Sequence, residues 1–172
     1  MSAVNQQERR EIEPWITGFT DGEGCFSVSF IRNKTNKSGW QVFPEFVITQ
    51  GAKSLKALEI FKGYFGCGRI FVNTRYDNHN EHLYRYCVRS LSDLSEKIVP
   101  FFKRHALKTA KNNDFLIFAK VIKLMEKRVH RKESGMRAIA RMAEKMNRKK
   151  KSRFLESSET ICRTPAKKPE KI

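Results

Sequence analysis

The sequence predicts an α+β fold in which two strand hairpins alternate with helices. The chain has 172 residues, of which 40% are hydrophobic and 13 are phenylalanine, so it can bury the core of one domain. After residue 24 the hydrophobic spacing changes from that of a helix to the alternation of a strand. Polar turns separate the later runs, and the predicted order is helix, two strands, helix, two strands, helices.

The segment "EPWITGFTDG" predicts the opening helix, with its start at Pro14, because proline suits the first turn of a helix. Trp15 and Phe19 are four residues apart, and so are Gly18 and Gly22. This spacing gives the helix one bulky face and one nearly bare face.

Two hairpins are predicted from alternating runs. "CFSVSFI" is a strand with one apolar face, and "WQVFPEFVITQ" returns after the polar turn "RNKTNKSG". Pro44 indicates that part of the returning strand lies at an edge or a bulge. "RIFVNTRY" and "LYRYCVRS" predict the second hairpin, joined by "DNHNEH".

The remaining helices follow from apolar positions at helical spacing. Ser54 is expected to cap the helix between the hairpins, and Pro100 to limit the helix at "SDLSEKIV". A long helix is predicted through "AKNNDFLIFAKVIKLM" and a basic one around "GMRAIARMAEKM". The predicted core positions are Leu55, Leu58, Phe61, Phe65, Phe115, Phe118, Ile122 and Met125.

The charge is strongly basic and unevenly distributed. The formal net charge is +17, and the segment from Lys120 to the C-terminus holds 18 basic and 6 acidic residues. Such an excess attracts polyanions, of which nucleic acid is the commonest. We expect an N-terminal extension over residues 1–13, one domain over 14–146, and a basic, flexible tail over 147–172.

Other classes of protein find no support in the sequence. The four cysteines form no CxxC pair, so neither a zinc ribbon nor a redox motif is indicated. His79 and His82 lie in a polar hairpin tip without the further ligands that an HNH nuclease or a zinc site needs. No signal peptide and no membrane-spanning run is seen, so we expect an intracellular protein, either organelle-encoded or from a bacterial cytoplasm.

Several segments together resemble one known family. "WITGFTDGEG", the strand end "VITQ", "YFGCGRI" and "FKRHALKTAKNNDFLIF" are similar to the LAGLIDADG homing endonucleases in their single-motif form. The resemblance implies an αββαββα fold with a saddle-shaped antiparallel four-stranded sheet and C-terminal helices. It also implies an intron-encoded enzyme that hydrolyses both strands of a long pseudo-palindromic DNA site and leaves short 3′ overhangs.

The glycines and the acid of the motif predict a two-subunit metal site. A bare helix face lets another helix approach closely, and a single motif copy makes the same helix of a second subunit the expected partner. The two Glu23 carboxylates then meet and need divalent cations between them. By the resemblance the Gly22 carbonyl also faces the metal, which is Mg²⁺; Mn²⁺ substitutes, and Ca²⁺ binds without supporting cleavage. The predicted homodimer interface comprises Trp15, Gly18, Phe19, Asp21 and Gly22.

Further catalytic candidates follow from the resemblance. The family's polar strand-end position falls at Gln50. Where some relatives have an arginine this chain has Ser54, which leaves Lys53 as a candidate. At the start of the long helix Lys111 is the first candidate to reach the scissile region, and Lys108 is its rival.

One face of the predicted sheet is expected to read double-stranded DNA. Alternate strand residues can reach base edges in a major groove, while their neighbours hold the core. Two subunits related by a two-fold axis would read a roughly palindromic site of about 20 base pairs. The predicted DNA-binding residues are Ser27, Ser29, Ile31, Arg32, Asn33, Lys34, Lys37, Gln41, Phe43, Glu45, Val47, Phe71, Asn73, Arg75, Arg85, Cys87 and Arg89.

Two alternatives remain open from the sequence. The first is a protein of the same fold that has lost cleavage, either an RNA maturase that binds intron RNA or a DNA-binding regulator. Glu23 at the metal position favours the enzyme, while Ser54 in place of the family's arginine weakens it. The second is a basic structural protein of a ribonucleoprotein, suggested only by charge and size.

Overall fold

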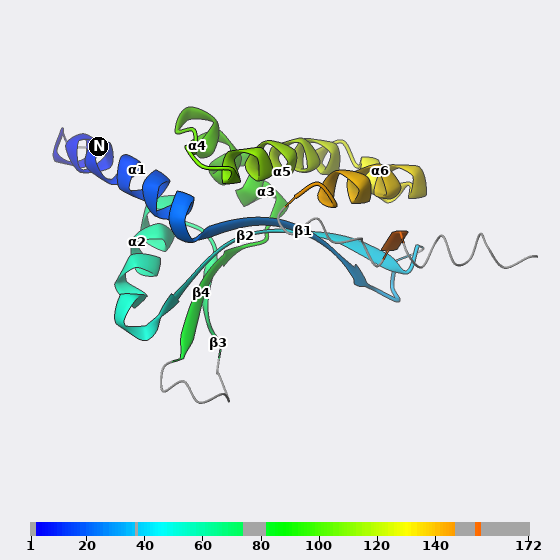
Figure 1. Cartoon of the computed structure of the whole chain (residues 1–172), viewed down its shortest axis with the longest axis horizontal. Coiled ribbons are helices and arrows are strands. Elements are labelled where there is room, and N and C mark those ends of the chain that lie inside the picture. Colours follow the sequence, from blue (N-terminus) through cyan, green and yellow to red (C-terminus); the bar gives the residue numbers. More distant parts are fainter. Residues whose placement is uncertain (1–2, 37, 74–81, 147–153, 156–172) are drawn as a thin grey trace, which may run out of the picture.

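A computed structural model describes residues 3–36, 38–73, 82–146 and 154–155 of the chain (Figure 1). The predicted α+β order of helix, hairpin, helix, hairpin and helices is confirmed. The elements are α1 (Ala3–Glu23), β1 (Gly24–Arg32), β2 (Trp40–Gly51), the short 3₁₀ turn η1 (Ala52–Ser54), α2 (Leu55–Phe65), β3 (Arg69–Asn73), β4 (Leu83–Val88), α3 (Leu91–Asp93), the π-helical turn η2 (Leu94–Ile98), α4 (Val99–Arg104), α5 (Lys111–Glu126), the 3₁₀ turn η3 (Val129–Arg131) and α6 (Glu133–Ala143).

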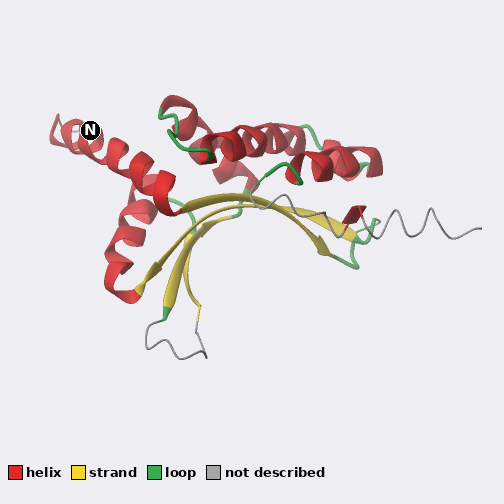
Figure 2. Cartoon of the chain, in the orientation of Figure 1, coloured by secondary structure: helices red, strands yellow, loops and turns green. Residues whose placement is uncertain are grey.

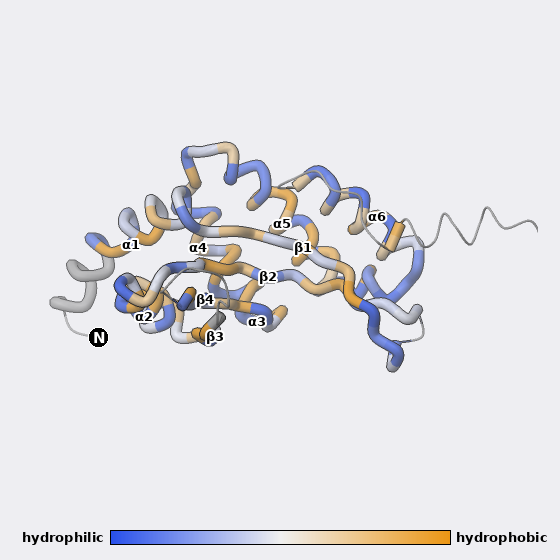
Figure 3. The backbone as a smooth tube through the Cα atoms, turned by 60° about the horizontal axis from the view of Figure 1, so that its bottom comes forward, coloured by the Kyte–Doolittle hydropathy of each residue, from blue (hydrophilic) through white to orange (hydrophobic). Residues whose placement is uncertain are grey.

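The four strands form one antiparallel sheet in the order β1-β2-β4-β3. The sheet is strongly curved: α4, α5 and α6 lie above its convex side, and α1 and α2 flank one end (Figures 1 and 2). Figure 3 turns the underside of the sheet toward the reader, and no described helix lies across it there. The molecule therefore has a helix-covered face and an open, concave face.

Phenylalanines fill the space between the sheet and the helices. Phe26 of β1 stacks on Phe46 of β2, with ring centroids 5.0 Å apart. Phe102, Phe115 and Phe118 from the helix layer surround the Phe26 ring at 5.2–5.3 Å. All five are at most 1% exposed, and burial of one such side chain contributes roughly 1.5–3 kcal/mol.

Proline positions differ most from the sequence prediction. Helix α1 begins at Ala3 rather than at Pro14, because the preceding residues are strong helix formers that offset one missing hydrogen bond. Pro100 does not limit its helix either. It lies in the first turn of α4, directly after the π-helical turn Leu94–Ile98, and a helix tolerates a proline in its first turn.

Pro44, in contrast, lies at an edge position of β2, as the sequence predicted. It pairs with Val28 of β1, and pairing of β2 with β4 begins only at Phe46. This part of β2 therefore has a strand neighbour on one side only, as the predicted edge position requires. Ser54 makes no side-chain cap bond to α2, because the 3₁₀ turn η1 occupies the start of the helix.

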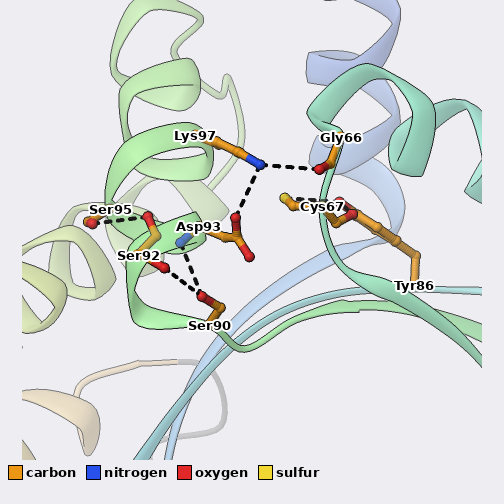
Figure 4. Close-up of polar contacts among 8 residues, drawn as sticks. All are labelled: Gly66, Cys67, Tyr86, Ser90, Ser92, Asp93, Ser95 and Lys97. Carbon is orange, nitrogen blue, oxygen red and sulfur yellow. Dashed lines mark hydrogen bonds and ion pairs between the residues drawn. The ribbon is translucent and has the colours of Figure 1, made fainter.

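Polar contacts fasten the helix layer to the start of β3 (Figure 4). The Lys97 ammonium donates to the Gly66 carbonyl at 3.2 Å and pairs with the Asp93 carboxylate at 3.1 Å. The Tyr86 hydroxyl of β4 donates to the Cys67 carbonyl at 3.1 Å. Gly66 adopts a left-handed conformation at the end of α2, which glycine allows without strain.

A second apolar cluster closes the far end of the sheet. Its buried members from α5 and α6 pack against Trp40 and Val42 of β2. Phe154 joins them: its ring stacks on Phe30 at 5.2 Å and lies edge-on to Trp40 at 5.7 Å. Phe154 and Leu155 thus pack with the domain, although both fall in the predicted flexible tail; the rest of that tail lies outside the described residues.

Candidate active site and nucleic-acid interface

Helix α1 ends against the sheet at a turn that only glycine can make. A Cβ placed on Gly24 would lie 2.6 Å from the Thr20 Cγ2 atom and 2.9 Å from the Thr20 carbonyl oxygen. The helix can therefore run directly into β1 without an intervening loop. Glu23, its last residue, is exposed at this junction.

Asp21 joins the end of α1 to the loop that precedes α5. Its carboxylate accepts hydrogen bonds from the Lys108 N–H at 2.6 Å, the Thr109 N–H at 3.2 Å and the Thr109 hydroxyl at 2.8 Å. Partial burial acts to raise the pKa of Asp21, but these bonds outweigh it and hold the pKa below its ordinary value. The predicted interface residue thus serves contacts within its own chain, and its place in an interface between copies stays a prediction.

Lys111 lies at the centre of the candidate active site. Its ammonium donates to the Thr20 carbonyl at 2.8 Å and to the Gly22 carbonyl at 3.1 Å. Burial lowers the pKa of Lys111, and the negative charges of Asp21 and Glu23 oppose that change. Since the last carbonyls of a helix carry partial negative charge, the lysine satisfies the end of α1.

The other catalytic candidates are more dispersed. Gln50 is half-buried and lies two residues beyond Ile48, the partner of Gly24 in the sheet. Lys53 is exposed in the turn η1. The Lys108 side chain is exposed, and the residue contacts Asp21 through its backbone N–H. Of the three candidate lysines, Lys111 is the one whose ammonium contacts α1.

The predicted division of α1 into a bulky face and a bare face needs correction, because residues 15, 18, 19 and 22 are spaced i, i+3, i+4 and i+7 and share one stripe of the helix. A Cβ at Gly18 or Gly22 would meet no other atom of the described chain within 4 Å. Beside the glycines on the same stripe, Trp15 and Phe19 pack on Phe61 of α2, with centroids 5.6 and 5.7 Å from it. The glycine face is therefore open to another helix, whereas Phe19 and most of Trp15 are used within the chain.

The described residues of one chain bring few metal-binding side chains together. Within the described ranges no three His, Cys, Asp or Glu side chains cluster to hold a metal ion. Burial raises the pKa of Cys25, which keeps that neighbouring thiol protonated. Glu23 and the Gly22 carbonyl offer hard oxygen donors, which suit Mg²⁺ or Ca²⁺. The Lys111 ammonium donates to the Gly22 carbonyl, so this oxygen already faces a positive charge, and its donor chemistry together with that of Glu23 fits a cation.

Most of the predicted DNA-reading strand residues share one face of the sheet, whereas Arg32 pairs with the buried Trp40 and belongs to the opposite face. Directly paired residues of antiparallel strands lie on the same face, and the register pairs Ser27 with Glu45 and Ser29 with Phe43. The same alternation continues through Val47 to Cys87. Since the paired core residues point to the helices, this set faces the concave side. Ile31 and Phe71 are each 40% exposed there.

Three residues of the predicted set do not reach the surface. Val47 is 7% exposed, Cys87 is 3% exposed and Glu45 is 9% exposed. Arg85 explains this, because it starts beside Thr49 and extends to the Glu45 carboxylate, a path that passes Val47 and Cys87. The expectation that these three residues touch base edges therefore needs correction: long neighbouring side chains cover them.

Two further residues on this face were missed in the sequence. Thr49 pairs with Arg85 and Arg69 pairs with Cys87, which places both among the concave-face residues. Counting back by two from Phe71 would have found Arg69.

The rest of the predicted set lies toward the far end of the sheet or outside the described residues. Arg32 lies over the Trp40 ring at 4.2 Å, and Asn33 donates to the Gln41 side chain at 2.9 Å. Lys34 is exposed in the turn between β1 and β2. The predicted contacts Lys37 and Arg75, the Asn73 side chain and His79 lie outside the described residues.

Comparisons with known proteins identify this combination of fold and site. The family model "LAGLIDADG endonuclease" matches residues 16–122. A crystal structure of the homing endonuclease I-TnaI superposes with a TM-score of 0.75 and 38% identity, over 87% of this chain and 97% of that one. The chain belongs to the LAGLIDADG endonuclease family.

The relatives differ in length. "Probable intron-encoded endonuclease 3" of Neurospora crassa is 30% identical over 138 residues, which are 79% of this chain and 25% of that protein. This chain spans about a quarter of the length of the first curated relatives it matches. I-SmaMI, solved with an uncleaved DNA target in the presence of calcium ions, is 34% identical with a TM-score of 0.75; the match covers 91% of this chain and 51% of that one. No helix in the described ranges is both long and apolar enough to span a membrane.

Proposed function

We propose that two copies of this chain form a site-specific DNA endonuclease that cuts both strands of a long, pseudo-palindromic site. The observation that carries the proposal is the open glycine face of α1, which ends at the exposed Glu23. Close approach of two such helices brings two carboxylates together, and this chain supplies only one of them.

The lengths of the relatives support assembly from two halves. I-TnaI is matched over nearly its whole chain, whereas I-SmaMI is matched over about half of its chain. A chain with one motif and one sheet resembles one half of the longer enzyme. We therefore place Gly18 and Gly22 at the contact between the copies, with Trp15 at its margin, since that ring is 37% exposed.

Glu23 and the Gly22 carbonyl of each copy are the residues that would hold divalent cations, with Mg²⁺ as the working ion. Mn²⁺ should substitute, and Ca²⁺ should bind without cleavage. Bound there, the ions would supply activation of water and neutralisation of charge on the phosphate. Asp21 fixes the loop before α5 and so positions the Lys111 ammonium on the Gly22 carbonyl, next to Glu23 in the chain. Such a preorganised charge stabilises a developing phosphate charge.

The concave face of the sheet would hold the DNA. It carries basic, polar and exposed apolar side chains, and its antiparallel strands fit a major groove. Two such faces related by a two-fold axis read about 20 base pairs, and cleavage across the minor groove between them leaves short 3′ overhangs. The gene should lie within an intron, as the name of the Neurospora relative states for that protein; an organelle or a bacterium are both suitable hosts.

Digestion of a randomised duplex library with Mg²⁺, followed by sequencing of the ends, tests this function. The expected result is one long, near-palindromic site with short 3′ overhangs. DNA that is bound tightly but not cut would instead indicate a DNA-binding regulator. Binding of structured RNA in preference to DNA would instead indicate an RNA-binding protein.

A further inference from the structure

We infer that Glu45 is a positioning residue that holds Arg85 and Arg89 as one preformed unit for reading guanine in each half-site. The inference rests on the proposed function, because it requires the concave face to bind DNA. It assigns Glu45 a role that differs from direct contact with a base.

Glu45 lies between two arginines on the concave face. Its Oε1 atom accepts from the Arg89 Nε at 2.6 Å, and its Oε2 atom accepts from the Arg85 Nη2 at 3.3 Å. The Glu45 side chain is 11% exposed, while those of Arg85 and Arg89 are 35% and 41% exposed. The carboxylate is thus covered by the two guanidinium groups, which are themselves accessible to a ligand.

Two aromatic rings fix the position of Arg89. Its guanidinium carbon lies 5.4 Å from the Phe43 centroid and 5.2 Å from the Phe71 centroid. Phe43 comes from β2 and Phe71 from β3, so the arginine is held by strands on both sides of β4. Guanidinium groups are stabilised by aromatic faces at this range. The Arg89 side chain therefore loses little conformational freedom on binding DNA.

The terminal donors of Arg89 match the acceptors of guanine. Arg89 uses its Nε for Glu45, so its two terminal Nη groups are the pair that it can present to a base, although its side chain also has the Cys87 thiol as a hydrogen-bond neighbour. A guanidinium pairs bidentately with the O6 and N7 acceptors of guanine, the commonest specific contact in the major groove. A direct contact between Glu45 and a base would require the carboxylate to accept from the amino group of cytosine, but the Glu45 side chain is 11% exposed and both of its oxygens bond to arginines. The unit keeps a net positive charge, since one carboxylate faces two guanidiniums.

The register fixes roughly where this guanine lies. Glu45 pairs with Ser27, four residues along the chain from Glu23. At about 3.3 Å per residue this is about 13 Å. The distance corresponds to about four base pairs at 3.4 Å each. We therefore expect the guanine about four base pairs outward from the cleavage position in each half-site.

Two substitutions separate the position of the carboxylate from its charge. Glu45→Asp keeps the charge but shortens the reach to the two arginines. Glu45→Gln keeps the reach but replaces one acceptor oxygen by a donor. Glu59→Gln, an exposed acid on α2, is the matched control for the loss of one charge. Each full-length variant is used to select bound duplexes from a randomised library without Mg²⁺, and its thermal unfolding is measured in parallel.

Unmutated protein and Glu59→Gln should select guanine at this position. In both Glu45 variants the preference for guanine over the other bases should fall roughly 5- to 150-fold, which corresponds to the loss of one bidentate contact. Both variants should remain folded. Glu45→Gln should also bind unselected DNA more tightly. An unchanged guanine preference in both Glu45 variants, or loss of a cytosine preference instead, would overturn the inference. Failure of the unmutated protein to select any duplex would refute the proposed function itself.

Discussion

The Lys111 ammonium donates to the Gly22 carbonyl at 3.1 Å and thereby joins the first residue of α5 to the end of α1. This contact spans 89 residues of sequence. It places a partly buried positive charge next to the exposed Glu23, at the point where we propose that a second copy brings its own acid.

Lys111→Met should lower double-strand cleavage at least 100-fold, while DNA binding changes little. The physical reason is the loss of a preorganised positive charge from the site of reaction. Cleavage rates on the selected duplex, measured with Mg²⁺, are the test. Lys108→Met is the control, because the Lys108 side chain is exposed and its contact with Asp21 is made by the backbone. A larger loss with Lys108→Met would transfer the role to that residue.

Asp21→Asn should destabilise the chain by roughly 1–3 kcal/mol at pH 7, because a charged acceptor of three hydrogen bonds is lost. The pKa of Asp21 is lowered in the folded state, so its contribution is complete above the ordinary value of 3.8. The contribution disappears as the pH falls through the lower folded value. Urea unfolding at several pH values measures this, and the gap to the unmutated protein should close in acid. A gap that is independent of pH would exclude the electrostatic origin.

Gly18→Leu should convert a dimer into a monomer without loss of folding. A Cβ at Gly18 meets no described atom of the chain, so the substitution strains nothing within one copy. It would, however, hold a second α1 helix away. Gly63→Leu on α2 is the matched control, since that glycine has equally open surroundings. Sedimentation and thermal unfolding distinguish the cases, and a dimeric Gly18→Leu protein would contradict the assigned interface.

Phe154→Ala should cost roughly 3 kcal/mol of unfolding free energy, typical of removing a buried aromatic ring. Phe154 is 4% exposed and contacts the rings of Phe30 and Trp40. Leu116→Ala, which alters a side chain that is 48% exposed, should cost much less. Chemical unfolding measures both free energies. If Phe154→Ala lowers the unfolding free energy as little as Leu116→Ala does, the segment around Phe154 is not part of the domain.

The fold could be predicted from the sequence because its determinants are local. Alternation marked β1 and β2, and helical spacing marked the buried residues of α5. The prolines were harder, because their effect depends on what surrounds them: Pro14 lies inside a helix and Pro100 follows a π-helical turn.

The site was predictable only where one motif holds it. Gly18, Gly22 and Glu23 lie on one short segment, whose spacing alone gives the two open glycine positions and the terminal acid. The contacts of Asp21 with Thr109 and of Glu45 with Arg89 join segments that are distant in the chain. No periodicity reports such pairs, and so Glu45 was expected at a base edge instead of beneath two arginines.

Cleavage of the selected duplex by Glu23→Gln most directly tests the claim that paired acids from two copies carry the reaction. Glu126→Gln, a change at an exposed acid that ends α5, serves as the charge control. With Mg²⁺, Glu23→Gln should bind the duplex as a dimer and cut it at least 100-fold more slowly than the unmutated protein and the control. Undiminished cutting of both strands by Glu23→Gln would contradict the claim.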